Sequence, residues 1–237
     1  MKTLFSLFFA LLFTITSVAQ ISENETAALK DFYRATQGDH WNQKWDLKKP
    51  VTEFDGVTIE NGHVTEIRML FNNLSGHLPS SLSNLTELKV LELSFNQLTG
   101  VIPSVFGQFE KLEVLALSGN DLNGSIPASI SKLKKLKQLH LSSNQFTGML
   151  PADIGALTQL EVFNVFDNDL SGALPLELAS NRNLREFMVA ENRFENSTQI
   201  STILLINSSG HLDLKDNLMV SPAGKSIIAV ESSDDKN

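Results

Sequence analysis

The chain has 237 residues, a formal net charge of −8 and no cysteine. The acidic balance argues against the phosphate backbone of a nucleic acid as a partner, because such binding sites are basic. The missing cysteines exclude disulfides, thiolate catalysis and cysteine-ligated metal sites together, and the length suits one elongated domain.

Residues 1–19 have the features of a secretory signal peptide. Lys2 is the charged start, residues 4–15 are mostly apolar, and Ser17-Val18-Ala19 is a small-residue cleavage site before Gln20. The alternatives are a buried helix or a membrane anchor, but the apolar run is shorter than the ~20 residues that a spanning helix needs. We therefore predict a mature chain without a membrane span. It would be secreted to the extracellular space or the cell surface, with the periplasm as an alternative.

Residues 20–63 are predicted to form an N-terminal cap made of a helix and a hairpin. Ser22 and Glu25 have the spacing of a capping box, and a helical stripe of apolar residues follows and ends at Gly38. The dipeptide Asn61-Gly62 separates two segments of strand-forming residues, which indicates a β-hairpin.

Trp41 and Trp45 stand close together between the predicted helix and hairpin. They could form a platform for a carbohydrate, or they could seal the end of a hydrophobic core. The second interpretation is favoured because the terminal coils of a repeat protein need a cover.

Residues 64–195 contain a motif that recurs every 24 residues. One copy reads LEVLALSGNDLNGSIP from Leu112 to Pro127, and shifted copies begin at Leu88 and Leu136. Its alternating apolar residues predict a short strand with one face in the core. The glycine suits a bend with positive φ, and the proline, which lacks an N–H, is expected on the convex side. No single coil can bury its leucines alone, so the coils must stack.

An asparagine stands where each predicted strand ends. Its side-chain amide can both donate and accept, so it can satisfy backbone groups that a tight turn would otherwise bury unpaired. Stacked coils are expected to align these residues as a ladder of Asn72, Asn96, Asn120, Asn144, Asn168 and Asn192.

The sixth copy begins at Leu184 but breaks at Asn196, where a glycine is expected and no proline follows. We predict that residues 196–230 form a C-terminal cap coil, with a last strand around Leu212 and Leu214. Residues 231–237 are polar and are predicted to be a disordered tail.

The spacing L-x-x-L-x-L-x-x-N-x-L, continued by Gly-x-Ile/Leu-Pro, resembles the plant-type, 24-residue leucine-rich repeat. The resemblance implies an α/β fold: a right-handed leucine-rich-repeat solenoid with a concave parallel β-sheet, preceded by an N-terminal helical/hairpin cap. Plant-type repeat proteins of eukaryotes usually carry cysteine pairs in their caps. The absence of cysteine here departs from that pattern and favours a bacterial member.

Candidate catalytic residues are few. His140 is expected on the exposed face of its strand, in the neighbourhood of a serine column formed by Ser94, Ser118 and Ser142. No G-x-S-x-G motif and no ordered acid accompany them, so a contact residue is favoured over a catalytic base. We expect no catalytic residue.

Asp167, Glu191 and Asp216 fall in one column of successive coils. Such a column could hold Ca²⁺, which takes several oxygen ligands. A solvated acidic edge is the favoured interpretation. We expect no metal ion and no cofactor.

The predicted function is binding. Core positions are committed to leucine and asparagine, so only the outward residues of the concave strands can encode a specific surface. The partner would be an extracellular protein, peptide or glycan, as the resemblance implies. The expected ligand-binding residues on the concave face are Arg68, Phe71, Glu92, Phe95, His140, Asn164, Phe166 and Met188. The alternative role of Phe95 and Phe166 is to pack on neighbouring coils.

A second class of function is a structural or adhesive cell-surface protein that acts by valency. A third, a secreted hydrolase, has little support because the chain lacks a nucleophile motif.

Overall fold

The computed structural model describes residues 21–195. The predicted signal peptide (1–19), C-terminal cap coil (196–230) and tail (231–237) lie outside the described residues.

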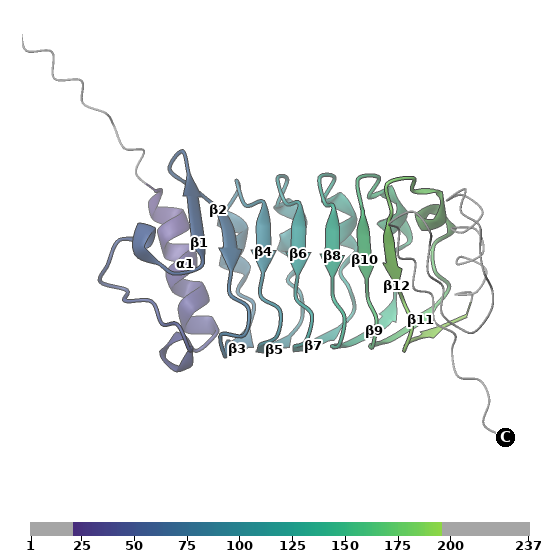
Figure 1. Ribbon diagram of the computed structural model, residues 1–237, viewed down its shortest axis with the longest axis horizontal. Coiled ribbons are helices and arrows are strands. Elements are labelled where there is room, and N and C mark those ends of the chain that lie inside the picture. Colours follow the sequence, from purple (N-terminus) through teal and green to yellow (C-terminus); the bar gives the residue numbers. More distant parts are fainter. Residues whose placement is uncertain (1–20, 196–237) are drawn as a thin grey trace, which may run out of the picture.

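The described chain is a solenoid whose main sheet contains seven strands (Figure 1). All of them except the first run parallel to their neighbours. Residues 24 positions apart pair across the sheet, as Val90 does with Val114. In spatial order the strands are β1 (Val57–Glu60), β2 (His63–Arg68), β4 (Val90–Glu92), β6 (Val114–Ala116), β8 (Gln138–His140), β10 (Val162–Asn164) and β12 (Glu186–Met188). We call this the concave sheet.

A second parallel sheet follows the turn after each concave strand, and the sequence analysis did not anticipate it. Five of its six strands contain the repeat glycine, and Gly100 and Gly124 have φ of 78° and 72°. The expected positive φ is therefore confirmed, but inside a strand and not in a loop. The strands are β3 (Ser75–His77), β5 (Gln97–Gly100), β7 (Asp121–Gly124), β9 (Gln145–Met149), β11 (Asp169–Gly172) and β13 (Arg193–Phe194).

Short 3₁₀ helices close each coil on the side opposite the concave sheet (Figure 1). Each begins directly after the repeat proline, which has no N–H to donate and sits at the N-cap position. They are η3 (Ser80–Asn84), η4 (Ser104–Gln108), η5 (Ala128–Lys132), η6 (Ala152–Ala156) and η7 (Leu176–Ser180).

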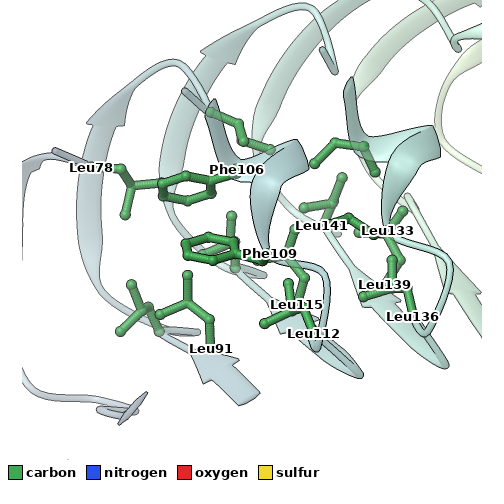
Figure 2. Close-up of a cluster of buried hydrophobic side chains, with 14 of the residues drawn as sticks. Leu78, Leu91, Phe106, Phe109, Leu112, Leu115, Leu133, Leu136, Leu139 and Leu141 are labelled. Atoms are coloured by element: carbon green, nitrogen blue, oxygen red, sulfur yellow. The ribbon is translucent and has the colours of Figure 1, made fainter. Parts of the chain in front are cut away.

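The core lies between the concave sheet and the 3₁₀ helices. Figure 2 shows leucines from successive coils stacked on each other, with Phe106 and Phe109 entering from η4 and the residue after it. These two rings lie 5.0 Å apart between centroids, and both are fully buried. Each coil therefore completes its core with side chains of its neighbours, as the repeat pattern requires.

The asparagines occupy the turn beneath the end of each concave strand. Asn120 Oδ1 accepts from the Leu98 amide at 2.9 Å. Its Nδ2 donates to the carbonyls of Leu93 and Leu117 at 3.1 and 3.0 Å. The same bonds recur at Asn96, Asn144, Asn168 and Asn192. Each side chain thus holds backbone groups of two coils together.

The N-terminal helix α1 (Glu23–Ala35) is fixed to the concave sheet by one buried carboxylate. Ser22 Oγ accepts from the Glu25 amide at 3.1 Å, as expected of a capping residue. The Glu25 side chain bridges the helix start and the hairpin: Oε2 accepts from Ser22 Oγ, while Oε1 accepts from the Val64 amide and contacts His63 Nδ1, all at 3.3 Å.

The predicted helix end at Gly38 was wrong. The helix ends at Ala35, and the left-handed residue after it is Gln37, with φ of 55°. Gly38 serves a different purpose, because a Cβ there would lie 2.3 Å from the Tyr33 ring. The hairpin prediction is confirmed: β1 and β2 pair antiparallel around Asn61-Gly62, both with positive φ.

Trp41 and Trp45 are only 1% and 4% exposed. Their indole N–H groups donate to the carbonyls of Thr36 and Asp55, each at 2.8 Å. Both rings pack in an aromatic cluster with Phe32 and other side chains of the cap. They seal the first coil, and the carbohydrate-platform interpretation was wrong.

Candidate binding surface on the concave sheet

The strand register aligns outward side chains of successive coils in columns. Five of the eight predicted ligand-binding residues share one column, which reads Arg68, Glu92, Ala116, His140, Asn164 and Met188. The parallel column toward the strand starts reads Glu66, Val90, Val114, Gln138, Val162 and Glu186. The chemistry thus changes from coil to coil while the backbone repeats.

Arg68 is held between two carboxylates. Its Nε lies 2.9 Å from Glu66 Oε2, and one terminal nitrogen lies 2.7 Å from Glu92 Oε2. The hydrogen bond that Arg68 donates to Glu66 is the main cause that raises the pKa of Arg68, followed on the raising side by the bond that it donates to Glu92. These pairs are partly exposed and add little stability, but they neutralise the one cation of this column.

His140 is a neutral polar group near pH 7. Burial lowers its pKa, and this effect outweighs the opposing influence of Glu186 and Glu92. Its Nε2 lies 3.2 Å from Gln138 Oε1. Asn164 Oδ1 accepts from the Phe166 backbone amide at 3.1 Å, and this bond fixes the orientation of the Asn164 side chain.

The serine column is engaged in its own hydrogen bonds. Ser142 Oγ donates to Ser118 Oγ at 2.9 Å, and Ser94 and Ser118 are both buried. No hydrogen bond joins these hydroxyls to His140 within residues 21–195. The arrangement supplies polar contacts and offers no activated nucleophile.

A further column begins just past the strand ends, where the sequence analysis had expected strand. Every residue in it has positive φ, between 50° and 65°. The members, which we call the rim column, are Phe71, Phe95, Gly119, Ser143, Asp167 and Glu191. The backbone amides of Asn96, Asn120, Asn144 and Asn168 each donate to the carbonyl of the rim residue in the next coil, as Asn120 does to Ser143. The only hint in the sequence was the glycine at one of the six positions.

Phe71 and Phe95 form an exposed stack in the rim column. Their ring centroids lie 4.6 Å apart, the planes differ by 2°, and the side chains are 66% and 50% exposed. Gly119 makes room for this stack, because a Cβ there would approach the Phe95 ring to 2.7 Å. Phe95 therefore packs on a neighbouring coil and also remains accessible, whereas Phe166 is half-buried.

Asp167 and Glu191 continue the rim column as exposed carboxylates. No lysine or arginine of residues 21–195 forms an ion pair with Asp167, Glu186 or Glu191. The third member of the acidic column considered for Ca²⁺, Asp216, lies outside the described residues. Within residues 21–195 no group of three or more acidic or histidine side chains is placed to hold a metal ion.

The opposite border of the concave sheet carries an edge ladder of alternating charge. Lys89 pairs with Glu60 at 2.5 Å, Lys137 with Glu113 at 2.7 Å, and Arg185 with Glu161 at 3.8 Å. The hydrogen bonds that Lys89 and Lys137 donate to these glutamates are the largest causes that raise the pKa values of the two lysines. The sequence signal was present, since residues 89, 113, 137, 161 and 185 alternate in sign.

The exposed face of the second sheet also has paired side chains. Gln97 Nε2 donates to Asn73 Oδ1 at 2.7 Å, and Gln145 Nε2 donates to Asp121 Oδ1 at 3.2 Å. Arg193 forms an ion pair with Asp169. We call these six residues the second-sheet column.

Comparison with known proteins decides the family. The sequence profile described as "Leucine-rich repeat region" matches residues 63–226. The chain belongs to the leucine-rich repeat family. The repeat period and the two sheets are those of its solenoid, and the match continues past the last described coil.

Similar leucine-rich repeat proteins come from plants. Receptor protein kinase WSS1 of Oryza sativa subsp. japonica is 39% identical over 88 residues, which are 35% of this chain and 9% of that protein. The leucine-rich repeat ectodomain of the receptor kinase SOBIR1 from Arabidopsis thaliana is 30% identical, with a TM-score of 0.66, and the alignment covers 74% of this chain and 97% of that one. The ectodomain of the Arabidopsis receptor kinase HAESA, in complex with a peptide hormone, is 28% identical, with a TM-score of 0.66 and coverage of 76% and 31%.

The leucine-rich repeat chain therefore spans nearly all of one receptor ectodomain and a small part of the two longer proteins. Within residues 21–195 no helix has both the length and the apolar character needed to cross a bilayer. The bacterial origin expected from the missing cysteines stays a prediction, since these relatives are plant proteins.

Proposed function

We propose that this leucine-rich repeat protein is a secreted binding module that recognises an extracellular protein, peptide or glycan on its concave face. One observation carries the proposal: the backbone repeats coil by coil, while the column from Arg68 to Met188 carries a different side chain in each coil and an exposed aromatic stack lies just past the strand ends. An exposed apolar pair on an otherwise polar face is typical of a contact site.

The contact residues in this proposal are the eight predicted from the sequence. Arg68, Glu92, His140, Asn164 and Met188 lie in one column, and Phe71, Phe95 and Phe166 flank it toward the rim. The receptor ectodomains to which the chain is similar support the proposal, since HAESA is described in complex with a peptide hormone.

Secretion is part of the proposal. The exported chain is expected to begin at Gln20, after removal of residues 1–19. Mass spectrometry of the protein recovered outside the cell tests this, and recovery with residues 1–19 intact would refute it.

The experiment for binding uses the mature chain as bait in its native extracellular milieu. One partner retained in a fixed ratio supports recognition. Self-association, or retention of whole cell surfaces without a defined partner, favours an adhesive protein that acts by valency.

The same bait locates the contact. Alanine variants of Phe95, His140, Asn164 and Phe166 are compared with Lys134→Ala, an exposed residue of the convex side. Loss of the partner from the four variants and not from the control supports the concave site. Equal retention by all five would contradict it.

A further inference from the structure

The rim column changes its chemistry in one direction along the solenoid. It begins with two phenylalanines, continues through Gly119 and Ser143, and ends with two carboxylates. All six residues have φ between 50° and 65°, and the side chains of the five residues other than Gly119 start from this same kind of turn. The column is a track with an aromatic end and an acidic end.

We propose that the rim column binds an extended peptide carrying a large apolar or aromatic side chain and, several residues away, a basic side chain. The inference rests on the proposed function and specifies the class of ligand for that face.

The aromatic end has a prepared apolar surface. Phe95 stacks on Phe71 and is backed by the backbone of Gly119, so the pair is supported on one side. Phe71 is the outermost ring and is two-thirds exposed, at 66%. An aromatic or aliphatic side chain of a ligand can stack on Phe71 without any rearrangement of the two phenylalanine rings.

Both phenylalanines keep positive φ, which is unfavourable for bulky residues. Gly119 and Asp167 occupy the same position elsewhere in the column at lower backbone cost. An exposed side chain held in a costly conformation is better explained by contact with a partner than by folding.

The acidic end lacks a cation in the described chain. Asp167 and Glu191 are exposed, and Glu186 stands on β12 in the outward column nearest the strand starts. In the edge ladder, by contrast, each glutamate forms an ion pair with a lysine or arginine of the same chain. Charge complementarity at Asp167 and Glu191 therefore requires a basic group from outside residues 21–195, and we assign it to the ligand.

The spacing of the two ends limits the ligand. Neighbouring strands of a sheet lie about 4.8 Å apart, so three steps from Phe95 to Asp167 span about 14 Å and five steps from Phe71 to Glu191 about 24 Å. An extended peptide rises about 3.3 Å per residue, so the apolar and basic side chains should be about four to seven residues apart. Gly119 and Ser143 between them are small enough for a peptide backbone to approach closely.

The test is a selection of peptides from a random dodecapeptide phage library on the immobilised mature chain. The enriched sequences are expected to combine an aromatic or large aliphatic residue with lysine or arginine about four to seven positions away. Recovery of enriched clones is then measured on Asp167→Asn/Glu191→Gln and on Phe71→Ser/Phe95→Ser. Serine is the native rim residue at position 143, so the second variant keeps a backbone that this turn accepts.

Each variant should lower recovery by about tenfold, the size expected for one charge-assisted or aromatic anchor. The matched control is Glu110→Gln/Asp153→Asn, which removes two exposed carboxylates from the convex side. It should leave recovery unchanged.

Three outcomes would overturn the inference: enrichment of peptides without the basic residue, an equal loss on the convex control, or no enrichment above an unrelated protein. Neutral or acidic peptides that still depend on the phenylalanines would sink the inference and leave the concave binding function standing. The binding function itself fails separately, if the partner captured from the native milieu ignores the concave variants.

Discussion

The rim column and the second-sheet column belong to the same coils, yet their exposed side chains differ in whether they pair with each other. Along the second-sheet column each polar group meets a partner one coil away, as Gln97 meets Asn73 and Arg193 meets Asp169. Along the rim, Asp167 and Glu191 have no basic partner among residues 21–195, and Phe71 and Phe95 expose their rings. Stacked coils can thus supply hydrogen-bond or ion-pair partners for every polar side chain of an outward column. A column whose charged groups lack such partners is the better candidate for contact with another molecule.

The largest loss of unfolding free energy should come from a change at Asn120, whose turn connects the concave sheet to the second sheet. Asn120→Ala would leave the buried Leu98 amide without its acceptor and would remove one of the two asparagine donors from each of the Leu93 and Leu117 carbonyls. The change should cost about 3 kcal/mol of unfolding free energy. Asn123→Ala alters an exposed residue and should change stability by about 0.5 kcal/mol or less. Urea denaturation of the two variants measures this difference. Equal midpoints would show that the ladder does not hold the coils.

Gly119→Ala in the rim column should lower stability more than Gly148→Ala in the second sheet. Gly119 and Gly148 both have positive φ, so alanine is strained at either by about 1–2 kcal/mol. Only at position 119 does the added Cβ also meet a ring, the Phe95 ring at 2.7 Å, whereas the nearest atom to position 148 is 3.8 Å away.

Thermal melting of Gly119→Ala and Gly148→Ala should show the larger loss for the first variant. Adding Phe95→Ser to each variant should close the gap between them. A gap that persists without the phenylalanine ring would contradict the role given to Gly119.

The double variant Phe71→Ser/Phe95→Ser tests whether the exposed stack of the rim column contributes to stability. Serine keeps the Cβ that makes positive φ costly, so the change relieves little of that strain, and it loses a ring stack of about 0.5–1.5 kcal/mol together with some apolar burial. We expect the unfolding free energy to fall by about 2 kcal/mol or less, because both rings are largely exposed. A loss of several kcal/mol in chemical denaturation would mean that the stack belongs to the core.

The smallest effect concerns His140. Burial lowers its pKa below the usual 6.5, so its protonation favours the unfolded chain. Its contribution to stability is therefore complete above about pH 6.5 and is lost as the pH falls from that value toward the folded pKa. Between pH 7.5 and 5.5 the parent should lose more stability than His140→Gln, by a few tenths of a kcal/mol to about 1.

A nuclear magnetic resonance titration of the His140 ring should place its midpoint below 6.5. Glu92→Gln should lower the midpoint further, because Glu92 acts to raise that pKa. Identical pH profiles for the parent and His140→Gln would contradict the burial of this imidazole.

Much of the fold follows from periodic residues in the sequence. The leucines and the asparagine of each 24-residue unit identified the solenoid and the concave strands, and Asn61-Gly62 identified the hairpin. The second sheet could not be seen, because its short strands contain a glycine at positive φ and lack the alternation of a strand. Gly38 misled because a glycine after a helix is usually its left-handed cap, and here it serves the Tyr33 ring.

The candidate site was predicted less completely. The column through Arg68, His140 and Asn164 follows directly from the repeat period. The rim could not be placed correctly, because aspartate, serine and phenylalanine give no common signal for a left-handed turn. The stacking of Phe95 on Phe71 depends on the close approach permitted by Gly119, which only the assembled coils reveal.

The most direct test of the central claim is the affinity of the captured partner for two matched sets of variants. Phe71→Ser/Phe95→Ser/Phe166→Ser changes the concave side, and Asn73→Ser/Gln97→Ser/Gln145→Ser changes the second sheet. Titration calorimetry should show the concave set weakened by about 30-fold or more, the effect of one lost hot spot, with the second-sheet set within about twofold of the parent. The opposite pattern, or full affinity in the concave set with its fold intact, would contradict the assignment of binding to the concave sheet.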